Sequence, residues 1–211
     1  MRLKPLLTIK ENKMPNWCDN TLHITHKNPE MMKKVIDAWN SGKFLQTMHP
    51  CPQELYDTYS GNKGKTDEQK ENERKEKANL EKYGFDNWYH WCLSNWGTKW
   101  DIDTLKSQND HNTCLEECFM SAWSPPIQFY EHLSKQGYEI EASYFEGGMG
   151  FCGNWSSDNG DEYYEIEECT PKWIESNIPE YICDKFGLLE FYTNDDDEVD
   201  EDDVLSQIIA E

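Results

Sequence analysis

The sequence lacks any run of about 20 apolar residues, the length that a membrane-spanning helix needs, so we expect no membrane span. The apolar stretch within residues 1–10 is too short and too interrupted for a secretory signal peptide. The eight cysteines include no C-x-x-C pair, which favours reduced thiols packed in a core over disulfides or a metal site. Together these absences predict a cytoplasmic protein.

The sequence also lacks the short motifs of common catalytic chemistry. It contains no Gly-rich phosphate loop, no nucleophile elbow and no H-E-x-x-H metal motif. Cys114 and Cys118 would share one face of a strand, but about 13 Å apart at ~3.3 Å per residue, too far to hold one zinc ion. His23 and His26 would fall on opposite strand faces. We therefore expect no metal, no cofactor and no catalytic residue of a familiar type.

Basic residues are scarce, with 20 Lys and Arg against 41 Asp and Glu, and the formal net charge is −21. Residues 151–211 hold 19 of the acidic residues and only two basic ones. The densest acidic run is Asp195, Asp196, Asp197, Glu198, Asp200, Glu201, Asp202 and Asp203. Such a run stays solvated and repels phosphate, so direct nucleic-acid binding is disfavoured. It also lacks the glycine-containing pattern of a calcium loop.

Apolar residues make up 36% of the chain, and nine tryptophans are among them, which is enough to build a core. Apolar periodicity predicts four strands, over residues 20–25, 99–106, 114–123 and 138–145. One helix is predicted after the first strand, with Asn28 as N-cap and Gly42 beyond its end. A second helix is predicted after the third strand, with Ser124 as N-cap and Gly137 as its stop.

The order strand–helix–strand–strand–helix–strand is that of a split βαβ, ferredoxin-like α+β domain with an antiparallel sheet. We place this domain at residues 14–168. It carries a helical insertion at about 51–98, after a strand-like piece at 44–55, and an extra β-hairpin that turns at 158–160. Residues 1–13 form an N-terminal extension that we expect to be poorly ordered. Residues 169–211 form an acidic C-terminal extension.

Four Trp-rich or Gly-rich strings stand out: MPNWCDN at 14–20, NWGTKWD at 95–101, AWSPP at 122–126 and YFEGGMGFCG at 144–153. In order and spacing they resemble the Api/YubB-type ferredoxin-like family, which bacteriophages and conjugative plasmids carry. The resemblance covers roughly residues 14–153. It implies the ferredoxin-like fold and the cytoplasm of a bacterial host as the setting. It implies no biochemical activity.

The strings contain six candidate structural or functional residues. Trp17 and Asn20 are expected to anchor the start of the fold through a buried indole and a side-chain-to-backbone hydrogen bond. The second string contributes Trp96, Lys99, Trp100 and Asp101. One hypothesis is structural: two tryptophans pin the insertion on the sheet, and Asp101 pairs with Lys99 or a backbone amide. The alternative is a small-molecule or nucleotide-processing enzyme with its site in a pocket at these residues.

RNA binding by the whole chain is disfavoured, because Glu139 and Glu141 take outward positions on a predicted strand where RNA-binding modules carry aromatic and basic residues. Two classes of function besides the enzyme remain open, an inhibitor that uses its acidic run and an accessory factor of another kind. The acidic run is either a solubilising tail or the contact surface for a host protein with a basic groove. In the second case the protein would be a non-enzymatic inhibitor of a host defence or nucleic-acid-processing protein, with the acidic surface imitating a phosphate backbone, or an accessory factor of another kind.

Overall fold

The computed structural model describes residues 16–59, 66–104, 107 and 113–195. The N-terminal extension predicted at residues 1–13 lies outside the described residues. So do residues 196–203 of the acidic run, and Asp195 is described only as the last residue of helix α9 (Leu188–Asp195). The predicted poor order of residues 1–13 and the predicted partner contacts of the acidic run therefore stay predictions.

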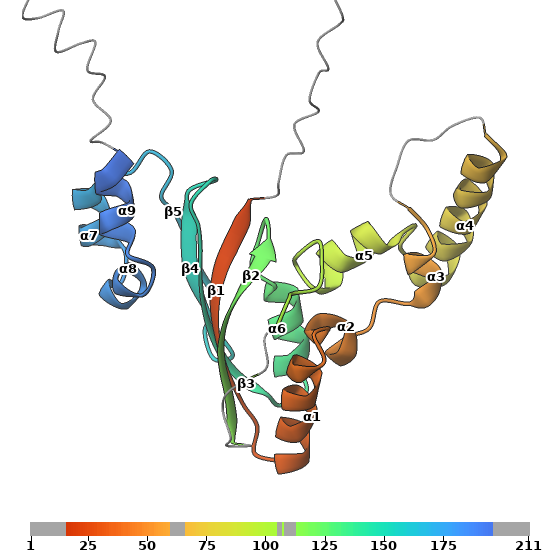
Figure 1. The fold of residues 1–211 in the computed structure, drawn as a ribbon, viewed down its shortest axis with the longest axis horizontal. Helices are drawn as coiled ribbons and strands as arrows, with labels where there is room; N and C mark the ends of the chain where they lie inside the picture. The colour runs from red at the N-terminus through yellow and green to blue at the C-terminus, as the bar shows by residue number, and fades with distance from the viewer. Residues whose placement is uncertain (1–15, 60–65, 105–106, 108–112, 196–211) are drawn as a thin grey trace, which may run out of the picture.

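In the described residues the fold is a mixed α+β arrangement on a five-stranded antiparallel sheet, in the order β2-β1-β3-β4-β5. The strands are β1 (Trp17–Thr25), β2 (Cys114–Ala122), β3 (Glu139–Glu146), β4 (Phe151–Ser156) and β5 (Gly160–Glu165). Strand β1 pairs with both β2 and β3, and the β4–β5 hairpin extends the sheet beyond β3. Helices lie on both sides of this sheet (Figure 1).

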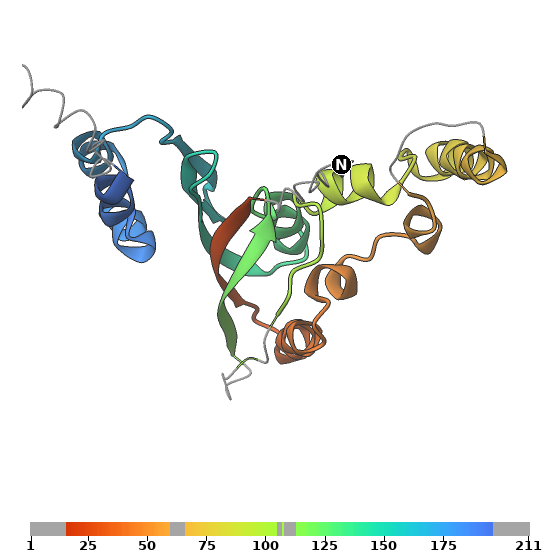
Figure 2. The same ribbon diagram turned by 45° about the horizontal axis from the view of Figure 1, so that its top comes forward.

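Six helices follow β1 or β2 along the chain, and the figures place them on one side of the sheet. They are α1 (Pro29–Asn40), α2 (Phe44–Met48), α3 (Gln53–Tyr56), α4 (Asp67–Tyr83), α5 (Trp88–Asn95) and α6 (Ile127–Ser134). Helices α1 and α6 lie next to the sheet, whereas α4 is the farthest from it in both views (Figures 1 and 2). The only buried residues of α4 are Asn72 and Asn79, and of its apolar side chains only that of Tyr83, its last residue, packs against the core.

The main core lies between the sheet and helices α1 and α6. Buried and more exposed residues alternate along β1, as the period of a strand requires. Leu22 and Ile24 belong to the same buried cluster as Trp39 of α1 and Phe129 and Leu133 of α6. The cluster includes α2 and extends into the inserted region through α3 and α5, which ties that region to the sheet.

The opposite face of the sheet carries a second, smaller core under three C-terminal helices. Helices α7 (Pro171–Asn177), α8 (Glu180–Phe186) and α9 lie on this side (Figure 1). Phe145 and Cys152 of the sheet form a buried cluster with Ile174, Ile182 and Leu188 of these helices. The predicted C-terminal extension is therefore an ordered layer of the fold up to α9.

The predicted limits of helix α1 are confirmed. The Asn28 side chain accepts a hydrogen bond from the backbone N–H of Glu30, and Pro29 occupies the first helical position, where its missing N–H is not needed. Gly42 follows the helix with a φ of +73°. This left-handed conformation suits glycine, which explains why the chain turns there.

The strand-like piece predicted at residues 44–55 is wrong, because the segment forms helices α2 and α3. Phe44, Leu45 and Met48 are buried together, and their spacing covers one helical turn. The Asp101 carboxylate, distant in sequence, accepts hydrogen bonds from the backbone N–H groups of Leu45 at 2.9 Å and Gln46 at 3.1 Å. Asp101 thus satisfies the free amides at the start of α2, a role that a residue next to the helix usually plays.

The strand predicted at residues 99–106 is also wrong over 99–104, the part that the structure describes. Here Asp101 caps α2, and the Thr104 hydroxyl donates a hydrogen bond to the carbonyl of Trp39 at the end of α1. These bonds hold the segment against helices instead of against an edge strand. Side chains with alternating polarity predicted the strand, but tertiary hydrogen bonds determine the conformation.

The imidazole rings of His49 and His132 stack, with centroids 3.6 Å apart and planes 18° apart. His132 is only partly exposed, because His49 covers its ring. Burial lowers the pKa of both rings, and the charge of His132 adds to the effect on His49. The neighbouring ammonium groups of Lys135 and Lys34 further lower the pKa of His132.

We expect this stack to make the protein less stable in mild acid. Each folded-state pKa lies below the unfolded value of about 6.5, so the unfolded chain takes up protons first as the pH falls below that value. The free energy of unfolding should therefore decrease between roughly pH 7 and pH 5. His132→Phe keeps an aromatic partner for His49 and removes one titrating group. In this variant the free energy of unfolding, measured with urea at several pH values, should decrease less steeply as the pH falls. Equal slopes for the two proteins would contradict this prediction.

Candidate functional site

The four strings singled out in the sequence meet at one end of the sheet. The Thr98 hydroxyl donates to the carbonyl of Ala122 at 2.9 Å, which joins the second string to the third. The Ser124 hydroxyl donates to the carbonyl of Gly97 at 2.6 Å. Ser124 was predicted to cap helix α6, but this bond to Gly97 takes its hydroxyl, and α6 begins at Ile127 without a side-chain cap.

The first and fourth strings join the same cluster. The backbone N–H of Trp123 donates to the carbonyl of Asn16 at 2.9 Å. The Asn20 side chain donates to the Ser121 hydroxyl at 2.9 Å, and Asn20 is paired in register with Tyr144 of the fourth string. The strings are therefore parts of one structural unit around the ends of β1, β2 and β3.

The two candidates in the first string differ in burial. The Asn20 side chain is buried and donates to the carbonyl of Cys18 at 2.7 Å, a side-chain-to-backbone bond of the predicted kind. The predicted burial of the Trp17 indole is wrong, because this residue is 44% exposed. Its ring lies 6.4 Å from the ring of Trp100, which is also largely exposed. These two tryptophans form a small exposed aromatic pair at the end of the sheet.

The four candidates in the second string also separate into buried and exposed members. Trp96 is fully buried, and its indole N–H donates to the carbonyl of His49 at 2.8 Å. The Asp101 carboxylate accepts three backbone N–H bonds, the third from Ile102 at 2.9 Å, while burial raises its pKa. Both residues use their polar atoms to hold backbone groups on either side of the insertion, at residues 45–49 and 102.

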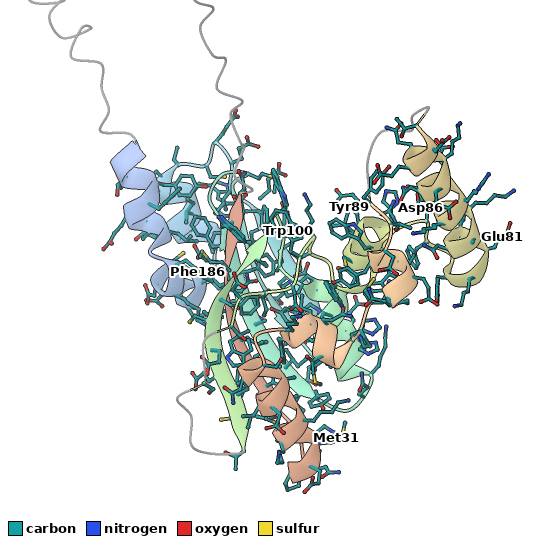
Figure 3. All side chains as sticks on the ribbon, turned by 45° about the vertical axis from the view of Figure 1, so that its right-hand side comes forward. Met31, Glu81, Asp86, Tyr89, Trp100 and Phe186 are labelled. Atoms are coloured by element: carbon teal, nitrogen blue, oxygen red, sulfur yellow. The ribbon has the colours of Figure 1, made fainter. Side chains whose placement is uncertain are left out.

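Lys99 does not pair with Asp101. Its ammonium lies 4.5 Å from the centroid of the Trp100 ring and 5.8 Å from that of Tyr89, a cation–π geometry. Figure 3 labels Trp100 and also Tyr89, which is on helix α5. The exposed half of the string is therefore a cationic and aromatic surface, separate from the buried half.

A hollow of about 390 Å³ lies beside Gly97, between the start of α6 and strands β3–β5. Aromatic, thioether and other apolar side chains form most of its wall, together with a glutamine, a tyrosine hydroxyl and a carboxylate. The wall includes Trp123, Met149, Phe151, Asp161, Tyr163 and Tyr144. Trp123 and Met149 come from the third and fourth strings, so the convergence of the strings builds this hollow.

Tyr144 and Asp161 form the main polar contact of the hollow. The Tyr144 hydroxyl donates to Asp161 Oδ1 at 2.7 Å. Partial burial raises the pKa of Asp161, the hydrogen bond from Tyr144 lowers it, and the charge of Glu131 raises it slightly. Burial also raises the pKa of Tyr144, so its hydroxyl remains a donor. Asp161 is not among the residues singled out in the sequence, because it lies outside the four strings, just after the predicted turn at 158–160.

Gly153 makes the contact between Tyr144 and Asp161 possible. It is the register partner of both Tyr144 on β3 and Tyr163 on β5. A Cβ atom at this position would lie 2.3 Å from Tyr144 Oη. The missing side chain thus leaves room for the Tyr144 ring to cross β4 toward β5.

A larger hollow of about 650 Å³ lies on the opposite face of the sheet, beside α8. Its wall includes His23, which is paired in register with Glu116 on one side and Glu141 on the other. The Lys185 ammonium donates to the hydroxyls of Thr21 at 3.3 Å and Ser143 at 3.2 Å. In the described part of the chain, no cluster of His, Cys, Asp and Glu could hold a metal ion.

Exposed carboxylates gather on β5, in the turn and connection that flank it and on the C-terminal helices, and we name this set the acidic surface. Its members are Asp158, Asp161, Glu162, Glu165, Glu167, Glu168, Glu175, Glu180, Asp184 and Glu190. Among the described residues, none of these carboxylates forms an ion pair. By contrast, helix α4 pairs its acids with bases, as in Lys70–Asp67 and Arg74–Glu71. The acidic surface is therefore uncompensated within the described fold.

None of the described helices combines the length and the apolar composition needed to span a membrane. No family model matches the chain. No curated protein matches it either. Among solved structures, the chain is similar to the protein api92 from Yersinia pseudotuberculosis, of family DUF1281, with a TM-score of 0.38 and 11% sequence identity. The similarity covers 72% of this chain and 98% of that one, and it is too distant to assign a family.

Proposed function

We propose that this protein is a non-enzymatic interaction factor that binds a partner with a basic surface through its acidic surface. The observation that carries the proposal is the set of ten exposed carboxylates on β5, in the turn and connection that flank it and on α7–α9, none of which forms an ion pair in the described residues. Uncompensated like charges repel one another and weaken the folded state, so internal stability does not account for them. A partner of opposite charge would remove that repulsion and would associate faster.

Exposed aromatic side chains among these carboxylates support a protein partner. Trp173 is 42% exposed, Tyr181 47% and Phe191 41%. Aromatic anchors surrounded by polar residues are typical of protein–protein interfaces. The acidic run at residues 195–203 follows in the sequence and carries eight further acidic residues.

The resemblance of the four strings to the Api/YubB-type family supports a mobile genetic element as the source and the cytoplasm of a bacterial host as the setting. The antiparallel order β2-β1-β3 agrees with the central strands of a ferredoxin-like sheet. Phages and plasmids benefit from blocking host enzymes that act on nucleic acid. We therefore propose a host defence or nucleic-acid-processing protein as the partner, with the acidic surface in place of a phosphate backbone.

Neutralising part of the acidic surface should abolish partner capture from a bacterial host lysate. The test variant changes Glu167, Glu168, Glu175 and Glu180 to Gln. A matched control removes the same charge from helix α4 by changing Glu68, Glu71, Glu73 and Glu81 to Gln. We expect the test variant to bind at least tenfold more weakly, the control to bind normally, and the wild type to release its partner between about 50 and 500 mM salt.

Two results would overturn the proposal: equal capture by both variants, or capture that does not depend on salt. A third protein that ends at Asn194 separates the contribution of the acidic run from that of the described acidic surface. Each variant is first checked by circular dichroism, because a misfolded protein would lose binding for another reason.

A second candidate is a small-molecule or nucleotide-processing enzyme with its site at the second string. The observation in its favour is the hollow beside Gly97, which contains a carboxylate of raised pKa. Trp96 and Asp101 would support that site without reacting in it, since their polar atoms bind the backbone. Turnover of a metabolite that Asp161→Asn abolishes would favour this candidate.

A further inference from the structure

The hollow beside Gly97 has aromatic walls that water reaches. Tyr163 is 56% exposed, Met149 42% and Trp123 38%. The rings of Phe151 and Tyr163 lie 5.5 Å apart along one wall. Large apolar side chains that converge on a hollow while remaining exposed are typical of binding sites, because folding alone would bury them elsewhere.

The backbone of Trp123 is strained. Its φ is +73°, a left-handed conformation that bulky residues rarely adopt. The turn is held by the Trp123 N–H bond to Asn16 and by the hydroxyl of Ser121, which donates to the carbonyl of Ser124 at 2.8 Å. Strain of this kind persists where the surrounding structure imposes it, and it is concentrated at functional sites. Here it sets the position of the indole at the edge of the hollow.

The chemistry of the hollow disfavours an anion. No basic residue is part of its wall. Helix α6 begins there, but two backbone N–H groups of its first turn are already used. Ile127 donates to the carbonyl of Pro125, and Phe129 donates to that of Trp96. A helix start with these two N–H groups occupied offers an anion less than a free helix start does.

A cation fits the same wall. Aromatic faces attract cations, and the attraction is strongest for tryptophan. Asp161 supplies a negative charge, and its Oδ2 accepts no hydrogen bond from the described residues, while Tyr144 holds Oδ1. A planar guanidinium both stacks on rings and pairs with a carboxylate, which an ammonium does less well. About 390 Å³ is enough for one such side chain.

We infer that this hollow binds an arginine side chain of the basic partner, with the guanidinium between Trp123 and Tyr163 and paired with Asp161. The inference rests on the proposed function, since it assigns the partner's anchoring residue. The acidic surface attracts the basic partner over a distance, and the hollow selects one side chain at contact. Asp161 belongs to both.

The test uses the peptide acetyl-Gly-Arg-Gly-amide and the full chain with its tryptophan indoles labelled with ¹⁵N. The indole signal of Trp123 is assigned by its absence in Trp123→Phe. We expect the peptide to shift this signal to saturation, and the citrulline analogue, which has the same shape without the charge, to bind at least tenfold more weakly. Binding of the citrulline analogue as strong as that of the arginine peptide would overturn the inference.

A pair of variants tests the role of Asp161. Asp161→Asn should weaken arginine binding at least tenfold. Glu117→Gln removes the same charge from strand β2, outside both the wall of this hollow and the acidic surface, and should leave binding unchanged. Unchanged signals of the other indoles show that both variants are folded. Equal weakening by the two variants would overturn the inference, because the effect would then come from net charge alone.

The two proposals fail separately. If the hollow binds no arginine but partner capture still depends on salt and on Glu167, Glu168, Glu175 and Glu180, only this inference falls. If the hollow binds arginine but capture ignores those carboxylates, the proposed function falls.

Discussion

Trp96→Ala should lower the free energy of unfolding by about 3–5 kcal/mol, the usual loss for a buried tryptophan. The Trp96 side chain has no exposed surface, and its ring packs edge-to-face against Trp91 at 5.6 Å. Removing it opens a cavity between the insertion and the core and leaves the carbonyl of His49 without its donor. Urea unfolding followed by far-UV circular dichroism measures the loss.

Trp100→Ala is the matched control, since it removes the other tryptophan of the same string. Trp100 is 39% exposed, and its ring contacts are to Lys99 and to the exposed ring of Trp17. We expect a loss of about 1 kcal/mol or less, as for a surface substitution. Similar losses for both variants would contradict the division of the string into a buried anchor and an exposed surface.

Gly153→Ala should destabilise the protein by about 3 kcal/mol, the upper part of the range for overpacking a core. The new Cβ would lie 2.3 Å from Tyr144 Oη and 2.5 Å from the backbone carbonyl oxygen of Glu162. The Tyr144 ring is fully buried and cannot swing out, and the Glu162 carbonyl belongs to the adjacent strand β5. Thermal and urea unfolding should both show the loss.

Gly160→Ala separates steric contact from backbone conformation. Gly160 has a φ of +76°, but a Cβ there meets no atom within 4 Å. Its substitution should lower the free energy of unfolding by only about 1 kcal/mol, the usual penalty for a residue with a side chain in the left-handed conformation. If Gly160→Ala proved the more harmful of the two, the steric argument for Gly153 would be wrong.

Local signals in the sequence predicted the elements whose ends depend on neighbouring residues. Asn28 and Pro29 mark the start of α1, and the turn before Gly160 marks the β4–β5 hairpin. The same reasoning failed at residues 44–55 and 99–104, where the deciding group is Asp101. No pattern within a few residues of α2 indicates that a carboxylate more than 50 positions away satisfies its first amides.

The candidate site was predictable to the same extent. The four strings could be recognised as unusual, and the structure brings them together. Asp161 could not be found, because its link to Tyr144 depends on the absence of a side chain at Gly153 and on the pairing of β3, β4 and β5. The roles of Trp96 and Trp100 could not be distinguished either, since burial depends on the path of the insertion.

The capping of α2 by Asp101 also has a consequence for how the chain folds and varies. A helix of five residues does not persist by itself, so α2 forms only when residue 101 arrives and closes the loop between them. Closing such a loop depends only weakly on its length, with about 0.6 kcal/mol for each doubling. Helix α4 adds no fully buried apolar side chain to the core, and only Tyr83 at its end packs against it. The stretch around α4 is therefore where this fold can gain or lose residues during evolution while its core and sheet stay intact.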